Sequence, residues 1–325
     1  GGIQMKKIAV LGNLLQPSHH VLIDSTAARC GFAADYYPDS RVPAEKAGQY
    51  EVLYGMPKPT DLKSFTGLKW FCGNFAGVDA YLDDALYPSP DVMLSNSSGA
   101  YGVTIAEHLI MVTLMLLRHA PAYVRDADAH HWGQVVPMRS IIGSTITVLG
   151  TGDIGTEFAR RAKAMGAKSI RGVRRTKKAA DPAFDGVYTH DELDDLLPDT
   201  DILVMALPST PDTVGILSRQ RIALLPETAY VVNVGRGTAI DQPALVEALN
   251  AGRLAGAALD VFAREPIPDG DPVWEARNLL ITPHISGQMS LGYTRDKNVA
   301  LFCEDLENYA AGRPLARYVD RRIGY

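Results

Sequence analysis

Short apolar runs recur along the chain and fall into two regions. In the first hundred residues they are separated by loops rich in proline, such as the segment around Pro57 and Pro59. Apolar runs of this length, bounded by turn-forming residues, are typical of buried strands. The predicted strands lie at 8–11, 51–54 and 68–72. We therefore expect a small α/β domain over about the first hundred residues.

A long apolar block separates the two regions. Residues 103–117 predict a helix that ends near Pro121. Its most apolar part, 109–117, has nine residues, well short of the roughly 20 that a transmembrane helix requires. We expect a buried helix that crosses between the two domains, and no membrane segment.

The second region begins at Thr145 and alternates strands with helices. A helix over 156–165 should bury Phe158, Ala162 and Met165, which are spaced by four and three. The predicted strands lie at 146–149, 169–173, 202–207, 230–234, 257–261 and 279–282. Strands that alternate with helices predict a parallel, doubly wound sheet of the Rossmann type.

One helix of this region has marked ends. Asp241 is expected as its N-cap, Pro243 lies in its first turn, and Gly252 follows its last turn. The predicted buried face consists of Leu245, Val246 and Leu249. Beyond Gly287 the chain becomes helical again, and we expect that helix to pack on the first domain.

Length and composition narrow the class of protein. A chain of 325 residues suits two domains of roughly 100 to 200 residues each. With 46% hydrophobic and 21% charged residues, it has the composition of an ordinary globular protein. A formal net charge of -5 gives no general attraction to nucleic acid. Small-molecule chemistry is therefore the expectation, without a nucleic-acid partner.

The three cysteines, Cys30, Cys72 and Cys303, are far apart and form no Cys-x-x-Cys pair. This spacing favours neither a disulfide framework nor a zinc site. We expect no metal and a reducing, cytoplasmic location. The four residues before Met5 lack a signal-peptide pattern, and we expect them to be a cloning remnant.

A glycine pattern stands between the first strand and the first helix of the second region. The run VLGTGDIG, residues 148–155, contains G-x-G-x-x-G. The first glycine permits a tight turn, the second lets backbone approach a pyrophosphate, and the third lets the helix pack on the strand. The helix N-terminus adds unpaired N–H groups. We expect a dinucleotide to bind here, at Gly150, Gly152, Asp153, Ile154 and Gly155.

The next strand end bears on which dinucleotide binds. An NAD-binding unit usually has Asp or Glu about 20 residues beyond the glycines, and this chain has none there. It has Arg174, Arg175 and Thr176 instead, followed by two lysines. These groups suit the extra 2′-phosphate of NADP. We expect NADP(H) as the preferred cofactor, with NAD(H) possible; the alternative is that this run is only a solvated loop.

Three later segments, 233–237, 260–266 and 282–287, each follow the end of a predicted strand. The carboxyl ends of parallel strands form one edge of the sheet, and ligands bind at that edge. Residues distant in sequence are therefore expected to converge there.

The side chains in these segments suit the reduction of a 2-oxo acid. That reaction needs a cation for the carboxylate and the carbonyl oxygen, which Arg236 can supply, and a proton donor, which His284 can supply. Glu265 is the carboxylate expected to favour the charged form of His284 by raising its pKa. Taken singly, each residue also has a structural interpretation: a strand-end contact, a solvated loop residue and a hydrogen-bonded histidine, respectively.

With these motifs in place, the chain closely resembles the D-isomer-specific 2-hydroxyacid dehydrogenase family over nearly its whole length. Segments that resemble the family's three signatures are 148–173, 201–213 with its Leu-Pro-x-Thr-x-x-Thr pattern, and 230–236. The segments around Glu265 and His284 match as well. Glu265 in place of glutamine argues against the formate dehydrogenase branch.

The resemblance implies roles for individual residues. Arg236 would bind and polarise the substrate, His284 would act as general acid in reduction, and Glu265 would orient His284. Asp260 would lie near the nicotinamide carboxamide. Backbone groups of Phe75, Ala76 and Gly77 would hold the substrate carboxylate. The remaining expected cofactor contacts are Leu207, Pro208, Thr213, Val234, Gly235, Ser286 and Gly287.

The resemblance also implies the domain plan and the assembly. Residues 1–98 and 288–325 would form a smaller flavodoxin-like substrate domain, with a dinucleotide-binding domain inserted at 99–287. Homodimers formed through the cofactor domain are usual in the family.

The expected function is hydride transfer between NAD(P)H and a small 2-oxo acid of the glyoxylate or hydroxypyruvate type. One alternative is a non-catalytic dinucleotide sensor that binds a protein partner as a dimer. Another is a dehydrogenase of the phosphoglycerate or phosphite type, although residues that indicate a phosphorylated substrate are not evident.

Overall fold

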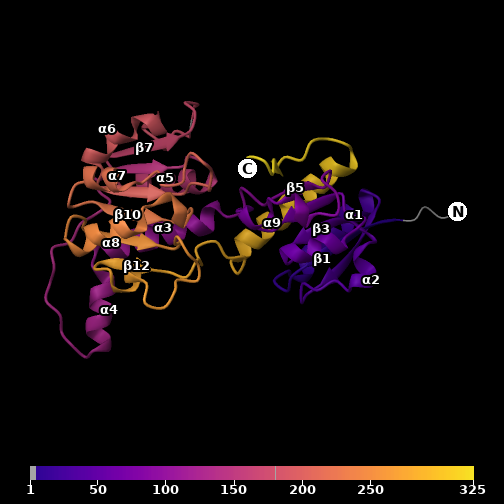
Figure 1. Ribbon diagram of the computed structural model, residues 1–325, viewed down its shortest axis with the longest axis horizontal. Helices are drawn as coiled ribbons and strands as arrows, with labels where there is room; N and C mark the ends of the chain where they lie inside the picture. The colour runs from indigo at the N-terminus through magenta and orange to yellow at the C-terminus, as the bar shows by residue number, and fades with distance from the viewer. Residues whose placement is uncertain (1–4, 180) are drawn as a thin grey trace. The chain divides into compact units, whose positions relative to one another are not determined.

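The computed structural model describes residues 5–179 and 181–325, which divide into two compact units (Figure 1). One unit consists of the described residues up to Tyr101 together with Gln288–Tyr325, and the other is Gly102–Gly287. Each is built on a largely parallel sheet, so the predicted two-domain α/β class is confirmed. The expected cloning remnant, 1–4, lies outside the described residues.

The Gly102–Gly287 unit contains a seven-stranded sheet in the order β12-β11-β10-β9-β6-β7-β8. Every neighbouring pair in it is parallel. The strand order reverses between β6 and β9, which makes this a doubly wound sheet of the Rossmann type. The strands are β6 (Thr145–Leu149), β7 (Ser169–Arg174), β8 (Gly186–Thr189), β9 (Ile202–Met205), β10 (Tyr230–Asn233), β11 (Gly256–Leu259) and β12 (Leu279–Ile281).

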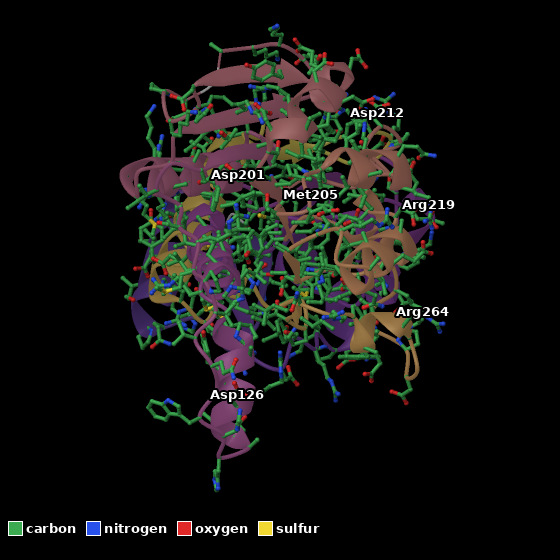
Figure 2. The ribbon with its side chains drawn as sticks, turned by 90° about the vertical axis from the view of Figure 1, so that its left-hand side faces the viewer. Asp126, Asp201, Met205, Asp212, Arg219 and Arg264 are labelled. Carbon is green, nitrogen blue, oxygen red and sulfur yellow. The ribbon has the colours of Figure 1, made fainter. Side chains whose placement is uncertain are left out.

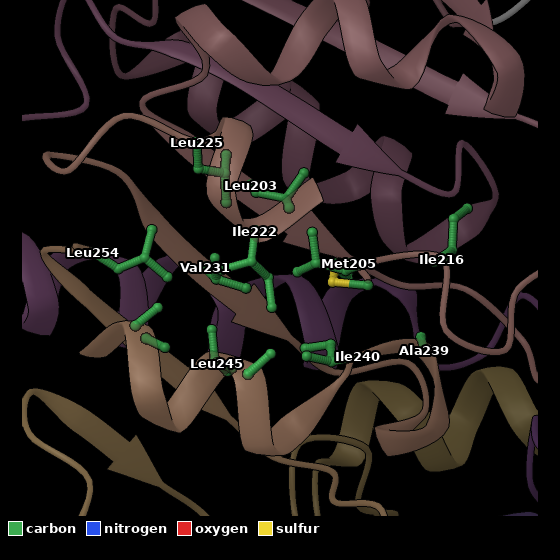
Figure 3. Packing of buried hydrophobic residues seen from close by; sticks show 14 of the residues in the cluster. Leu203, Met205, Ile216, Ile222, Leu225, Val231, Ala239, Ile240, Leu245 and Leu254 are labelled. Atoms are coloured by element: carbon green, nitrogen blue, oxygen red, sulfur yellow. The ribbon is translucent and has the colours of Figure 1, made fainter. Parts of the chain in front are cut away.

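Helices bury apolar residues against this sheet. Figure 3 shows Leu203, Met205 and Val231 from the strands packed with Ile222 and Leu245 from two helices. Each buried side chain of this size contributes about 1.5–3 kcal/mol relative to an exposed one. The helices of the unit are α3 (Gly102–Leu117), α4 (Ala120–Asp128), α5 (Asp153–Ala164), α6 (Leu193–Leu196), α7 (Arg219–Leu224) and α8 (Gln242–Asn250).

The ends of α8 form as its sequence predicts. The Asp241 carboxylate accepts a hydrogen bond from the Ala244 N–H at 3.1 Å, as an N-cap does. Gly252 follows the helix with a φ of +69°, a conformation that favours glycine. The predicted buried face is confirmed for Leu245, Val246 and Leu249.

Two predictions about the helix over 156–165 were wrong. Helix α5 begins at Asp153 rather than Thr156, because its first turn directly follows Gly152. Its end at Ala164 leaves Met165 as a cap residue that is 37% exposed, so Met165 is not part of the buried face. Helix α3 ends at Leu117, as predicted, and Pro121 lies in the first turn of α4, where proline is tolerated because its missing N–H is not needed.

Helix α3 is the core helix of its unit, with nine buried residues that include Ile105, Leu109 and Val112. No single helix in the described part of the chain is long and apolar enough to cross a membrane. Helices α3 and α4 pass that test only together, as a pair bent by 72°.

The second unit has a six-stranded sheet in the order β13-β5-β4-β3-β1-β2. Its first five strands are parallel in the flavodoxin-like order 2-1-3-4-5, and β13 pairs antiparallel with β5. The strands are β1 (Lys6–Leu11), β2 (Phe32–Tyr37), β3 (Tyr50–Gly55), β4 (Trp70–Gly73), β5 (Met93–Ser95) and β13 (Tyr318–Val319). The sequence pattern missed β2, β5 and β13, because they are short or are half-buried edge strands without an apolar run.

Helices cover both faces of this sheet. Along β1, Ile8 and Val10 face one apolar cluster, and Ala9 and Leu11 face another. Helix α9 belongs to the first cluster, where Phe302 stacks on Tyr54 with ring centroids 4.1 Å apart. The expectation that the chain after Gly287 forms a helix packed on the first domain is thus confirmed. The helices are α1 (Pro17–Arg29), α2 (Ala44–Ala47) and α9 (Gly292–Ala310).

Candidate active site

The glycine turn joins the carboxyl end of β6 to the start of α5. Gly150 has a φ of +101°, and a Cβ there would lie 2.7 Å from the Ala206 carbonyl oxygen. A Cβ on Gly155 would collide with the Gly150 carbonyl group. Both positions therefore require glycine, one for the turn and the other for the contact between helix and strand.

The same turn has the open space that a pyrophosphate needs. A Cβ on Gly152 would meet no atom within 4 Å, and the N-terminal N–H groups of α5 begin at the next residue. Of the other residues expected here, Ile154 follows in the first turn. Asp153 packs its carboxylate against Gly102, at the start of α3. The turn therefore fits a dinucleotide phosphate.

The basic loop follows β7. Arg174 is the last residue of that strand and is in register with Thr189 of β8. Arg175 and Thr176 follow in an exposed position, and Lys177 pairs with Glu192 at 3.4 Å. No Asp or Glu occupies residues 172–178. The exposed charge at this strand end is positive.

The loop after β9 carries the Leu-Pro-x-Thr-x-x-Thr pattern. Leu207 is buried and Pro208 is exposed. The Thr213 hydroxyl donates to the Pro208 carbonyl at 2.7 Å and accepts from the Thr210 N–H at 2.9 Å. These bonds close the loop on itself, so Thr213 shapes the loop through its own side chain.

Arg236 lies just beyond β10, after Val234 and Gly235. The side chain of Asn233, the last residue of β10, bridges this turn: its amide group accepts from the Gly235 N–H at 2.9 Å and donates to the Arg236 carbonyl at 3.0 Å. A Cβ on Gly235 would lie 2.6 Å from the Leu207 carbonyl oxygen, which requires glycine there. Sequence reasoning passed over Asn233, although a polar residue ending a buried strand was a usable signal.

Glu265 and His284 come together although they are 19 residues apart. His284 Nδ1 lies 2.6 Å from Glu265 Oε2, and the other oxygen, Oε1, accepts from the Phe262 N–H at 2.9 Å. Both carboxylate oxygens are thus engaged, which fixes the orientation of the imidazole ring. The His284 side chain is 51% exposed, so its Nε2 is available to a ligand.

Asp260 supports the backbone that carries His284. Its carboxylate is buried and accepts three hydrogen bonds, from the Thr282 hydroxyl at 2.7 Å, the Ile285 N–H at 2.9 Å and the Ser286 N–H at 3.0 Å. His284 itself has a φ of +52°, which is uncommon for a residue other than glycine. The bonds on either side of it hold this conformation in place, and Gly287 ends the segment.

A second histidine lies behind this segment. His108 of α3 is buried, and its Nε2 is 3.5 Å from the Thr282 hydroxyl. Burial lowers the pKa of His108, while the nearby Asp260 carboxylate acts in the opposite direction. His108 is therefore a neutral packing partner of the His284 segment near pH 7. Its position in an apolar helix gave no sign of this contact.

In the other unit, the loop after β4 has its carbonyl groups tied down. The Ser97 hydroxyl donates to the Gly73 carbonyl at 2.9 Å, the Ser97 N–H to the Phe75 carbonyl at 2.9 Å, and the Asn96 amide to the Ala76 carbonyl at 2.8 Å. Within the described residues, no acceptor takes the N–H groups of Phe75, Ala76 or Gly77. Successive unpaired N–H groups suit a carboxylate.

Metal ligands were not expected anywhere in the chain. Over the residues that the structure describes, no group of three or more His, Cys, Asp or Glu side chains is placed to hold a metal ion.

The chain is similar to one known family and to several solved structures. Residues 110–286, more than half of the chain, match the family model "D-isomer specific 2-hydroxyacid dehydrogenase, NAD binding domain". A family protein from Aeromonas salmonicida subsp. salmonicida A449 is similar at 30% identity and a TM-score of 0.83, with 97% of this chain and 99% of that chain covered.

Two further similar structures contain a dinucleotide. A D-isomer specific 2-hydroxyacid dehydrogenase from Xanthobacter autotrophicus Py2, in complex with NADPH and MES, has 28% identity and a TM-score of 0.80, with 99% and 100% covered. An NADPH-dependent glyoxylate/hydroxypyruvate reductase from Sinorhizobium meliloti, in complex with NADP and sulfate, has 27% identity and a TM-score of 0.79, with 98% and 100% covered. The chain belongs to the D-isomer specific 2-hydroxyacid dehydrogenase family, and it is an NAD(P)-dependent oxidoreductase of small 2-hydroxy and 2-oxo acids.

Proposed function

We propose that this dehydrogenase reduces short 2-oxo acids of the glyoxylate and hydroxypyruvate type to D-2-hydroxy acids, with NADPH as the preferred reductant. The observation that carries the proposal is the half-exposed His284, held by Glu265 at 2.6 Å beside a strand end of the dinucleotide-binding sheet. That arrangement offers a proton at an oriented nitrogen, which the reduction of a carbonyl group requires.

His284 supplies the proton. Its Nδ1 is held by Glu265, so Nε2 is the nitrogen that donates to the carbonyl oxygen of the acid as that oxygen becomes an alkoxide. The Glu265 carboxylate holds the ring in the orientation from which Nε2 can donate. When bound, the reduced nicotinamide supplies the hydride to the carbonyl carbon.

Arg236 supplies the positive charge that binds the acid and stabilises the developing negative charge on its oxygen. The turn that carries it is held by the Asn233 amide group, so the backbone beneath the guanidinium is fixed before substrate binds. In the other unit, we assign the N–H groups of Phe75, Ala76 and Gly77 to the substrate carboxylate. Their lack of acceptors within the described part of the chain supports this role.

The cofactor contacts are assigned from position. The turn with Gly150, Gly152, Asp153, Ile154 and Gly155 would hold the pyrophosphate. Asp260 would lie near the nicotinamide carboxamide. The loops that contain Leu207, Pro208, Thr213, Val234, Gly235, Ser286 and Gly287 would line the rest of the dinucleotide site.

The preference for NADPH rests on the positive strand end of β7. Arg174, Arg175 and Thr176 offer guanidinium and hydroxyl donors, and residues 172–178 contain no Asp or Glu to accept from the ribose hydroxyls. Relatives from Xanthobacter and Sinorhizobium were solved with NADPH and NADP. Charge-assisted contacts of this kind would favour the 2′-phosphorylated NADPH over NADH by about 10- to 100-fold.

The proposed function is tested by following the oxidation of NADPH and NADH against glyoxylate, hydroxypyruvate, pyruvate and phenylpyruvate. We expect turnover with the first two acids and a higher kcat/KM for NADPH than for NADH. Absence of turnover with every acid, despite measurable binding of NADPH, would contradict the reductase assignment and favour a sensor.

The cofactor preference has its own test. The double change Arg174→Ala and Arg175→Ala should lower kcat/KM for NADPH by about 10- to 100-fold and leave that for NADH little changed. Lys177→Ala is the matched control, because Lys177 belongs to the same loop but already pairs with Glu192. Equal losses for both cofactors would reject the 2′-phosphate role.

We also propose a homodimer formed through the dinucleotide-binding unit, in a cytoplasmic enzyme. Helix α4, which carries Asp126, projects from the sheet of its own unit (Figures 1 and 2). The segment that follows α4 exposes Trp132 by 98%, Val135 by 91% and Met138 by 61%. Exposed apolar residues in such density mark an interaction surface.

Trp132→Ser should shift the mass measured by light scattering from dimer to monomer. An unchanged mass would reject this surface.

A further inference from the structure

The loop that we assign to the substrate carboxylate begins with a side chain whose carbonyl oxygen has no hydrogen-bond donor among the residues that the structure describes. Asn74 directly follows β4, at the carboxyl end of a parallel strand. Its Oδ1 atom is buried, and within the described residues no donor lies within hydrogen-bonding distance. A buried carbonyl oxygen without a donor is destabilising, and such groups are few in folded proteins.

The backbone around Asn74 is too firmly held for the loop to relieve this defect. The Asn74 N–H donates to the Gly55 carbonyl at 3.2 Å. Its own carbonyl accepts from the Asn298 amide at 3.0 Å and also from the Tyr101 hydroxyl. Asn74 is thus fixed at both backbone groups while its side-chain oxygen remains unsatisfied.

The residues that hold Asn74 are themselves fixed. The Tyr54 hydroxyl donates to Asn298 Oδ1 at 2.6 Å, and the Ser97 hydroxyl lies 3.2 Å from the same oxygen. Asn298 and Ser97 are buried. This network fixes the backbone of Asn74, the residue that directly precedes Phe75, Ala76 and Gly77 of the loop.

An acceptor at this place selects for a donor on the substrate. The carboxylate and the carbonyl oxygen of a 2-oxo acid are both acceptors, so neither can bond to Asn74 Oδ1. Among glyoxylate, pyruvate and hydroxypyruvate, the hydroxyl on carbon 3 of hydroxypyruvate is the one donor. Hydroxypyruvate has this group, pyruvate has a methyl in its place, and glyoxylate lacks the carbon.

We propose that Asn74 is a specificity-determining residue whose Oδ1 accepts a hydrogen bond from the C3 hydroxyl of the substrate, so that the enzyme prefers 3-hydroxylated 2-oxo acids. The proposal rests on the proposed function and on the assignment of this loop to the substrate. It narrows the substrate class from short 2-oxo acids in general to those with a hydroxyl next to the carbonyl group.

The test compares hydroxypyruvate with pyruvate, which differ by one oxygen atom, using the full chain and NADPH. The readout is the ratio of the two kcat/KM values. The wild-type ratio should favour hydroxypyruvate, and Asn74→Ala should lower the ratio by about 10- to 100-fold. Asn74→Asp keeps an acceptor oxygen, so it should preserve the ratio. Its added negative charge should weaken the binding of both acids equally.

Asn96→Ala is the matched control. Asn96 also stabilises this loop, through its bond to the Ala76 carbonyl, but its Oδ1 already accepts from the Ser98 N–H at 3.2 Å. Its loss should lower kcat/KM for both acids together without changing their ratio. Thermal melting without substrate separates the two as well: Asn96→Ala should lower Tm, whereas Asn74→Ala removes an unsatisfied group and should not.

The outcomes distinguish this inference from the proposed function. A wild-type enzyme that reduces no 2-oxo acid contradicts the proposed function itself. One that reduces such acids, but with a ratio that does not depend on residue 74, overturns the role of Asn74 alone. Turnover of other 2-oxo acids without any of hydroxypyruvate overturns it as well.

Discussion

The carboxyl ends of the two parallel sheets carry different chemistry. In the Gly102–Gly287 unit, the strand ends lead to ionisable side chains, of which Asp260, Glu265 and His284 are each fixed by hydrogen bonds. In the other unit, the loop after β4 offers backbone N–H groups and the neutral amide of Asn74. We infer that the first edge performs proton transfer, and that the second recognises the shape and polarity of the acid.

If this contrast is correct, the largest loss of activity should come from a substitution at the strand ends of the Gly102–Gly287 unit. His284→Ala removes the proton donor and should lower kcat by about two to four orders of magnitude. Binding of NADPH, followed by its fluorescence, should be retained. His20→Ala in the other unit, which removes a ring stacked on Tyr36, is the control and should keep kcat. An unchanged kcat in His284→Ala would remove the basis for the comparison.

A substitution of Arg236 should cause the next largest loss of activity. Arg236→Lys keeps the charge but loses the forked donor geometry, and it should lower kcat/KM for the acid by about 10²- to 10³-fold. We expect the KM of the acid to rise more than that of NADPH, measured by varying each at saturation of the other. The opposite pattern would mean that Arg236 contacts the nucleotide instead.

A substitution of Asp260 tests whether activity also depends on the hydrogen bonds that hold the backbone around His284. Asp260→Asn replaces one acceptor oxygen with an N–H donor, so one of its three bonds is lost. It should lower the free energy of unfolding by about 1.5–3 kcal/mol, measured by denaturant titration, and should reduce kcat by displacing His284. Asp269→Asn, at an exposed position nearby, is the control. Full stability with full activity would show that the lost hydrogen bond is dispensable.

The smallest expected effect is a pH dependence of stability at His108. Because burial lowers its pKa below the ordinary 6.5, the unfolded chain binds a proton at His108 more readily than the folded protein. The stabilising contribution is complete above pH 6.5 and decreases as the pH falls below that value, towards the folded-state pKa. The free energy of unfolding should fall from pH 7 to pH 5 in both proteins, and it should fall less in His108→Gln than in the wild type. Identical slopes would exclude this contribution.

Side-chain chemistry explains why the two edges were not equally predictable. Arg236, Glu265 and His284 are ionisable residues just beyond predicted strands, and both features can be seen in the sequence. The free N–H groups of Phe75, Ala76 and Gly77 leave no such trace, because every residue except proline has one. Whether an N–H is free depends on which carbonyl groups the fold brings near it.

Edge strands were missed for a related reason. Strands β2 and β8 are half-buried along most of their length, so neither shows the apolar run that identified β6 and β9. Pairing with a neighbour, rather than local composition, makes them strands. The misplaced start of α5 has a similar cause, since the tight glycine turn allows the helix to begin at Asp153.

The sequence by itself determined the doubly wound sheet, the glycine turn at 150–155 and the ionisable residues at the strand ends, because periodicity and residue type encode them locally. The tertiary structure alone decided that Glu265 meets His284, that Asp260 holds the backbone beside it, and that Asn74 Oδ1 finds no donor among the described residues. Those features depend on distances between residues far apart in the chain, which the packing of strands and helices sets and no local pattern encodes.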